Sequence, residues 1–159
     1  MKLWMTVVAV FALAGSATAM AQNSTEPDMG TWILNLAKSK YDPAALAPKS
    51  ETRTLEQTPD GMIHETIQVE RADGQISKQG STLQRNGKPF RFTGNPNLDT
   101  IEVTRINSQA ITITQLLKGK VIGYQVSSLS ADGKVLTLKR TITTATGETQ
   151  HDVRIYDRQ

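Results

Sequence analysis

The sequence IHETIQVE at residues 63–70 alternates apolar and polar side chains, and this period of two decides the fold. Ile63, Ile67 and Val69 fall on one face, and most of the polar residues between them fall on the other. An Asp-Gly pair lies shortly before the stretch and another shortly after it. Asp-Gly favours tight hairpin turns because these residues tolerate positive φ. The stretch therefore predicts one strand of an antiparallel sheet with one buried face.

The same alternation recurs along most of the chain, as at residues 101–104, 111–114 and 136–143. Turn sequences separate these segments at intervals of about one strand plus one turn. Residues 43–47 can form one helical turn at most because Pro48 stops it. We predict an all-β fold, an antiparallel up-and-down meander of about 8–10 strands that closes into a barrel. A β-sandwich is the alternative.

The N-terminus has the features of an export signal. Lys2 precedes an apolar run at residues 3–14, which is too short to span a bilayer, and Ala19-Met20-Ala21 has the A-x-A form of a cleavage site. We predict a signal peptide at residues 1–21 cleaved after Ala21, a flexible tail at 22–29 and a single barrel domain at 30–159. The expected location is periplasmic or secreted.

Charge and cysteine content narrow the expected partners. The net charge is +3, or +2 without Lys2, and basic residues are interleaved with acids rather than clustered. This distribution predicts no nucleic-acid partner, and the lack of a second long apolar segment predicts no membrane span. No cysteine is present, so no disulfide framework is expected.

Two short motifs near the ends of the predicted domain resemble a known superfamily. Gly30-Thr31-Trp32 resembles the first strand of calycins, which include lipocalins and fatty-acid-binding proteins, and Arg154-Ile155-Tyr156 resembles the closing strand of the latter. Residues 30–41 also resemble the start of a group of small exported bacterial proteins with no established role. The calycin resemblance implies that Arg154 and Tyr156 point into the barrel and bind a ligand carboxylate. Fatty-acid-binding proteins carry a helical lid after the first strand. In this sequence only residues 37–50 are available for such a lid, and they contain two prolines.

The same resemblance implies a structural role for the ends of the chain. An arginine of the last strand, Arg154 or Arg158, is expected to stack on Trp32 and close one end of the barrel. We therefore assign Gly30, Trp32 and Arg158 to barrel closure.

Other polar residues fall on otherwise apolar strand faces. Arg105 and Arg140 continue such faces and could form an anion site with Arg154, while Gln115 and Glu65 lie on similar faces. The alternative is that these arginines reach solvent at strand ends or pair with Glu65. Tyr124 is assigned to the pocket, with ordinary core as its alternative.

Catalysis has little support in the sequence. Only two histidines occur, His64 and His151, and each adjoins an acid that points to the opposite face of a strand. We expect no enzyme activity, no metal site and no cofactor. Two hypotheses follow: a lipocalin-like protein that binds a small hydrophobic, amphipathic or carboxylate ligand, or a filled barrel that interacts with another envelope protein. The internal cavity distinguishes them.

Overall fold

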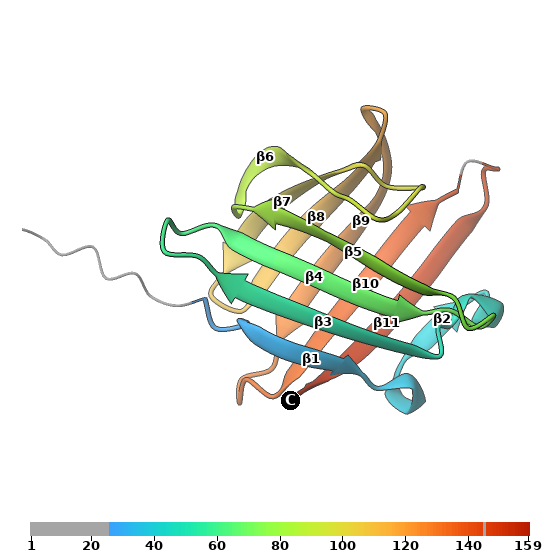
Figure 1. Cartoon of the computed structure of the whole chain (residues 1–159), viewed down its shortest axis with the longest axis horizontal. Helices are drawn as coiled ribbons and strands as arrows, with labels where there is room; N and C mark the ends of the chain where they lie inside the picture. The colour runs from blue at the N-terminus through green and yellow to red at the C-terminus, as the bar shows by residue number, and fades with distance from the viewer. Residues whose placement is uncertain (1–25, 145) are drawn as a thin grey trace, which may run out of the picture.

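The computed structural model describes residues 26–144 and 146–159, so the predicted signal peptide at residues 1–21 lies outside the described residues. Within the described residues, the chain forms eleven β-strands and two short 3₁₀ turns (Figure 1). The elements are β1 (Gly30–Leu34), η1 (Leu36–Lys38), β2 (Lys40–Asp42), η2 (Ala44–Leu46), β3 (Ser50–Gln57), β4 (Ile63–Glu70), β5 (Ile76–Leu83), β6 (Asn86–Arg91), β7 (Thr100–Asn107), β8 (Ala110–Leu117), β9 (Lys120–Leu129), β10 (Val135–Thr143) and β11 (Thr149–Arg158).

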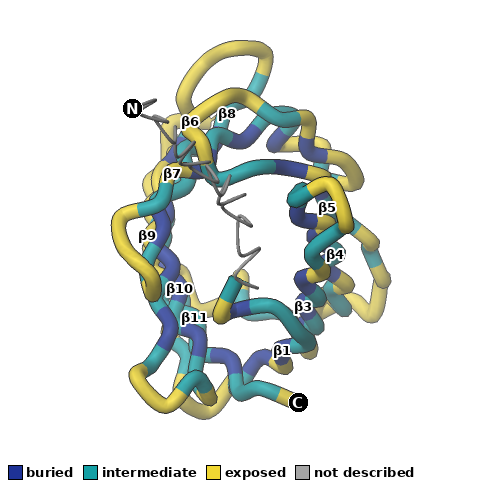
Figure 2. The backbone as a smooth tube through the Cα atoms, turned by 90° about the vertical axis from the view of Figure 1, so that its left-hand side faces the viewer, coloured by how far each residue is buried: buried dark blue, intermediate teal, exposed yellow. Residues whose placement is uncertain are grey.

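The strands form one antiparallel sheet in the order β5-β4-β3-β1-β11-β10-β9-β8-β7-β6. The sheet curls into a nearly closed barrel (Figure 2), and this confirms the predicted all-β meander rather than the sandwich. Gly80 and Thr93 join the two ends of the sheet through backbone hydrogen bonds of 3.1 and 2.9 Å. A Cβ atom at Gly80 would lie 2.1 Å from the carbonyl oxygen of Glu65 on the neighbouring strand β4, so position 80 requires glycine.

The structure has one strand more than the upper end of the predicted range. The additional element is β2, a three-residue strand that pairs with β11 at Asp152 and its two neighbours. Its sequence, Lys-Tyr-Asp, is too short to show the alternation by which a strand is recognised.

The barrel interior divides into an apolar half and a polar half. Inward-facing apolar residues fill the half that contains the start of β1 and the end of β11. Its largest side chains are Trp32 and Tyr156, both 0% exposed. The other half opens between η2, the hairpin turns that follow β4, β8 and β10, and the loop between β6 and β7, and we call this opening the mouth.

Arg158 closes the apolar end. Its guanidinium lies 4.3 Å from the centre of the Trp32 ring, and it donates hydrogen bonds to the carbonyl groups of Pro27, Met29 and Gly133 at 2.6 to 2.8 Å. Of the two arginines that the sequence left open for this contact, Arg158 makes it. Gly30 is adjacent, since a Cβ atom there would lie 3.1 Å from Arg158 Nη1.

Residues 26–29, which belong to the predicted tail, cover the closed end of the barrel. Asp28 is buried, and both of its carboxylate oxygens accept hydrogen bonds from Arg85 at 2.9 and 2.6 Å. The Asp28 carbonyl also accepts a hydrogen bond from the Trp32 indole at 2.9 Å. These partners lie 57 residues away or on the first strand, so the polar composition of the segment did not show that it covers the closed end.

Candidate ligand-binding site

Six charged side chains point into the polar half of the barrel. They occupy strand positions on the same faces as core residues such as Leu55, Ile67, Leu138 and Tyr156, because side chains two positions apart share a face. The six are Glu51 and Arg53 on β3, Glu65 on β4, Arg140 on β10, and Asp152 and Arg154 on β11.

These side chains form a chain of alternating charges, which we call the ion-pair chain. It runs in the order Glu65, Arg53, Glu51, Arg154, Asp152, Arg140. Arg53 bonds Glu65 and lies 3.2 Å from Glu51, and Arg154 lies 3.0 Å from Glu51 and 2.9 Å from Asp152. Arg140 bonds the same oxygen of Asp152. Three positive and three negative groups therefore balance one another inside the barrel.

Glu51 is the most highly coordinated member of the ion-pair chain. It is 2% exposed, and the Tyr156 hydroxyl donates a hydrogen bond of 2.7 Å to its Oε1 atom. Burial by itself raises the pKa of the Glu51 carboxyl, but Arg154 and Arg53 outweigh it and hold the pKa below its ordinary value. The carboxylate is ionised at neutral pH.

Arg154 and Tyr156 both point into the barrel, where they bind the carboxylate of Glu51. Sequence reasoning missed Glu51 and Arg53. The signal that could have identified them is the alternation at residues 51–55, where Glu, Arg and Leu share one face.

Tyr41 on β2 lies beside the ion-pair chain, since its backbone pairs with Asp152 and its ring lies near Arg154. The guanidinium of Arg154 lies 5.5 Å from the centre of its ring. Its hydroxyl is buried and has no hydrogen-bond partner among the described residues. Burial raises the pKa of Tyr41 to about 12, and the Arg154 charge opposes this change.

Arg140 stands at the cationic end of the ion-pair chain. Among the described residues it has one carboxylate partner, whereas Arg53 and Arg154 have two each. Burial lowers the pKa of Arg140, and the positive charge of Arg154 lowers it further, with Asp152 only partly opposing both. Arg140 is therefore the least compensated cation of the ion-pair chain.

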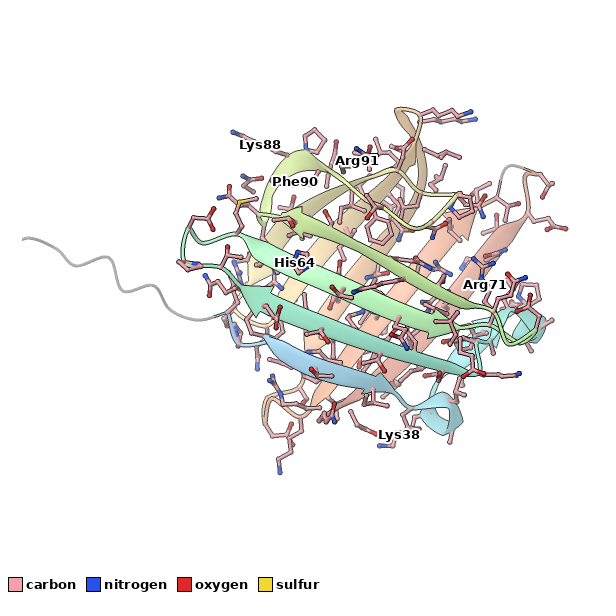
Figure 3. The ribbon with its side chains drawn as sticks, in the orientation of Figure 1. Lys38, His64, Arg71, Lys88, Phe90 and Arg91 are labelled. Atoms are coloured by element: carbon pink, nitrogen blue, oxygen red, sulfur yellow. The ribbon has the colours of Figure 1, made fainter. Side chains whose placement is uncertain are left out.

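Two adjoining hollows lie at the mouth. The first, of about 580 Å³, reaches down to Glu51, Arg53 and Arg154 and is lined on its apolar side by Ile67 and Phe92. The second, of about 770 Å³, extends between the turns after β8 and β10. Arg71 also lines the first hollow, and Figure 3 shows it at the end of the barrel where η2 lies. The two hollows share Asn95, Asn97, Leu98, Gln115, Arg140 and Gln150.

Two residues expected in the ligand site lie elsewhere. Tyr124 is 63% exposed on the outer face of β9, because its neighbours Gly123 and Gln125 take the inward positions. Arg105 lies at the closed end, where it forms an ion pair with Glu26. Neither residue lies beside Arg140 and Arg154. The partner of Glu65 is Arg53 and not Arg105, Arg140 or Arg154.

The two histidines lie on the outer surface. His64, labelled in Figure 3, hydrogen-bonds Thr82 on the exposed face of β4 and β5, and His151 hydrogen-bonds Thr141 in the same way on β10 and β11. Within the described residues, no group of three potential metal-binding side chains comes together, and no helix is long and apolar enough to cross a bilayer.

The depressed pKa of Glu51 predicts acid-sensitive stability. An acid whose pKa is lower in the folded state adds stability above its unfolded pKa, near 4.5, and this stability is lost as the pH falls through the folded value. We expect the free energy of unfolding, measured with urea between neutral pH and pH of about 3, to fall less steeply in Glu51→Gln than in the wild type. Glu56→Gln, an exposed acid on the same strand, is the control. An unchanged slope in Glu51→Gln would contradict the prediction.

The fold and the site together define a class: a nearly closed antiparallel barrel with an apolar end, a buried ion-pair chain and a polar mouth. No family model matches the sequence, and no curated protein matches it. Among solved structures, the chain is similar to Rv2717c from M. tuberculosis, with a TM-score of 0.51 and 13% sequence identity. The match covers 84% of this chain and 93% of that chain. At this identity the similarity shows the barrel fold alone, and it does not assign the chain to the calycins.

Proposed function

We propose that this protein is an exported, periplasmic binding protein that holds one small amphipathic or acidic molecule at the mouth of its barrel. The polar head of the ligand lies against Arg140. The observation that carries this proposal is that Arg140 ends the ion-pair chain with a single carboxylate partner and lines both hollows. The signal-peptide pattern of residues 1–21 supports export.

The electrostatics of the mouth favour an acceptor on the ligand. A buried guanidinium with one partner gains stability from a second acceptor, such as a carboxylate, phosphate or carbonyl oxygen. Gln115 and Gln150 line both hollows beside Arg140 and supply amide groups that can orient the same head.

The rest of the cavity suits an apolar tail of limited size. Ile67, Val69, Phe92 and Leu98 line the first hollow, and its volume lies within the range of about 300–1,000 Å³ that small-molecule sites occupy. A mixed wall of this kind supports an amphipathic ligand. The position of both histidines outside the cavity supports binding rather than catalysis.

Native mass spectrometry of the protein purified from its own periplasm tests this proposal. We expect a small molecule to copurify with the wild type and to be lost from Arg140→Ala, because losing a charge-assisted hydrogen bond weakens binding roughly 10- to 100-fold. Lys139→Ala is the matched control, since it removes the same charge from the neighbouring, outward-facing position.

Two outcomes of this experiment contradict the proposal. A ligand retained equally by Arg140→Ala and the wild type would place the head group elsewhere. A folded wild type that carries no ligand, and that binds none from a panel of fatty acids, phospholipids and neutral lipids, would favour the interaction-protein hypothesis.

A further inference from the structure

The side chains around Glu51 form a complete carboxylate-binding site inside the barrel. Arg53 and Arg154 contact the two oxygens of Glu51 at 3.2 and 3.0 Å, and the Tyr156 hydroxyl donates to Oε1 at 2.7 Å. An ionised carboxylate only accepts hydrogen bonds, and here two guanidinium groups and one phenol donate to it. Charge-assisted hydrogen bonds of this kind are the strong ones in proteins.

This site adjoins the space where a ligand would lie. Glu51, Arg53 and Arg154 all line the first hollow, together with apolar residues such as Ile67 and Phe92. If the Glu51 carboxylate is set aside, the arrangement is that of a binding site for an amphipathic acid. Cationic donors lie at the bottom and an apolar wall lies above them.

We propose that Glu51 acts as an internal substitute for a ligand carboxylate and is the residue that determines specificity. It occupies the site formed by Arg53, Arg154 and Tyr156, keeps monocarboxylic acids out of it, and confines the ligand head to Arg140 nearer the mouth. This inference rests on the proposed function for its consequence at Arg140, but the carboxylate site itself can be tested independently.

The charge balance supports this role. With Glu51 present, Arg53, Arg154 and Tyr156 already donate to its carboxylate, so a second carboxylate would have to displace that charge from its donors. Without Glu51, Arg53 keeps only Glu65 and Arg154 keeps only Asp152, while the Tyr156 hydroxyl has no acceptor among the contacts of the described residues. The vacated site would then carry one net positive charge and three unused donor groups.

Rescue of a Glu51→Ala variant by small carboxylates tests the inference. We expect formate, acetate and propionate at tens of millimolar to raise the melting temperature of Glu51→Ala by about 5 °C above that in matched chloride, with little effect on the wild type. We also expect decanoate to bind Glu51→Ala at least about tenfold more tightly than the wild type in calorimetry.

Two further variants separate this effect from a general stabilisation by salt. Glu51→Leu fills the space of the carboxylate with an apolar group and is expected to show no rescue. Glu51→Ala combined with Tyr156→Phe keeps the space but removes one donor, and is expected to need several-fold more acetate for the same rescue. If Glu51→Ala is unfolded in chloride, the carboxylates are expected to restore its fold.

A Glu51→Ala protein that neither gains carboxylate binding nor is stabilised or refolded by carboxylates would overturn the inference. Equal rescue of Glu51→Leu would overturn it as well. The proposed function and this inference can fail separately. If Arg140→Ala loses the copurifying ligand but Glu51→Ala shows no rescue, the function stands and the inference is refuted. If Glu51→Ala is rescued but the wild type carries and binds no ligand, the inference stands and the proposed function is refuted.

Discussion

Replacing Arg154 by alanine is expected to lower the free energy of unfolding by about 3–5 kcal/mol. Arg154 joins the two halves of the ion-pair chain, because it bonds Glu51 on β3 and Asp152 on its own strand. Its removal leaves both buried carboxylates short of a partner, and the cost of an uncompensated buried charge exceeds the value of the pair itself. Arg154→Ala also removes the contact between the guanidinium and the Tyr41 ring.

Urea unfolding at neutral pH, followed by the fluorescence of Trp32, measures this effect. Lys139→Ala serves as the control, because Lys139 is exposed on the outer side of β10, and we expect a change within about 0.5 kcal/mol. Arg154→Lys is expected to recover only part of the loss, since an ammonium group cannot present a planar fork to two carboxylates. A loss below about 1 kcal/mol in Arg154→Ala would show that the ion-pair chain rearranges without it.

Replacing Trp32 by alanine is expected to cost about 3–5 kcal/mol of unfolding free energy. Trp32 is completely buried at the closed end, where its ring contacts Arg158 and its indole nitrogen donates to the Asp28 carbonyl. The substitution leaves a large cavity, removes the stacking partner of Arg158 and frees the segment at residues 26–29. All three effects act in the same direction.

Circular dichroism follows the unfolding of this variant, because Trp32→Ala removes the fluorescent reporter. Ile33→Ala is the matched control, since Ile33 is the next residue on β1 but is 42% exposed, and we expect a loss of about 1 kcal/mol or less. Trp32→Phe is expected to fall between the two because it keeps an aromatic ring and loses the indole hydrogen bond. Equal losses in Trp32→Ala and Ile33→Ala would contradict the role assigned to the closed end.

The strand pattern was predictable because it depends on local rules. The alternation at residues 63–70 and the turn residues on either side specify a hairpin wherever the segment lies. The inward direction of Arg140 and Glu65 followed from the same parity, whereas that of Arg154 was expected only from the resemblance of its segment to a calycin closing strand. The three-residue strand β2 did not follow, because its pairing with β11 depends on residues more than 100 positions away.

The partners of the inward charges were not predictable in this way. Parity states which face a side chain occupies, but not which of the opposite charges on other strands it meets. Arg154 bonds Glu51 across 103 residues, and Asp28 bonds Arg85 across 57. Arg105 lies at the closed end because of its place along β7. Tyr124 lies outside because its neighbours Gly123 and Gln125 take the inward positions of β9.

The sequence by itself determined that this protein is an antiparallel β-meander, where most of its hairpins turn, and that several charged side chains face inward. These properties come from steric preferences and side-chain periodicity within a few residues. Only the tertiary structure decided that β1 pairs with β11, that Arg158 covers Trp32 and that Glu51 occupies the carboxylate site of Arg154 and Tyr156. Closing the barrel brings distant strands together, and buried charges then pair with whichever opposite charges that closure places within reach.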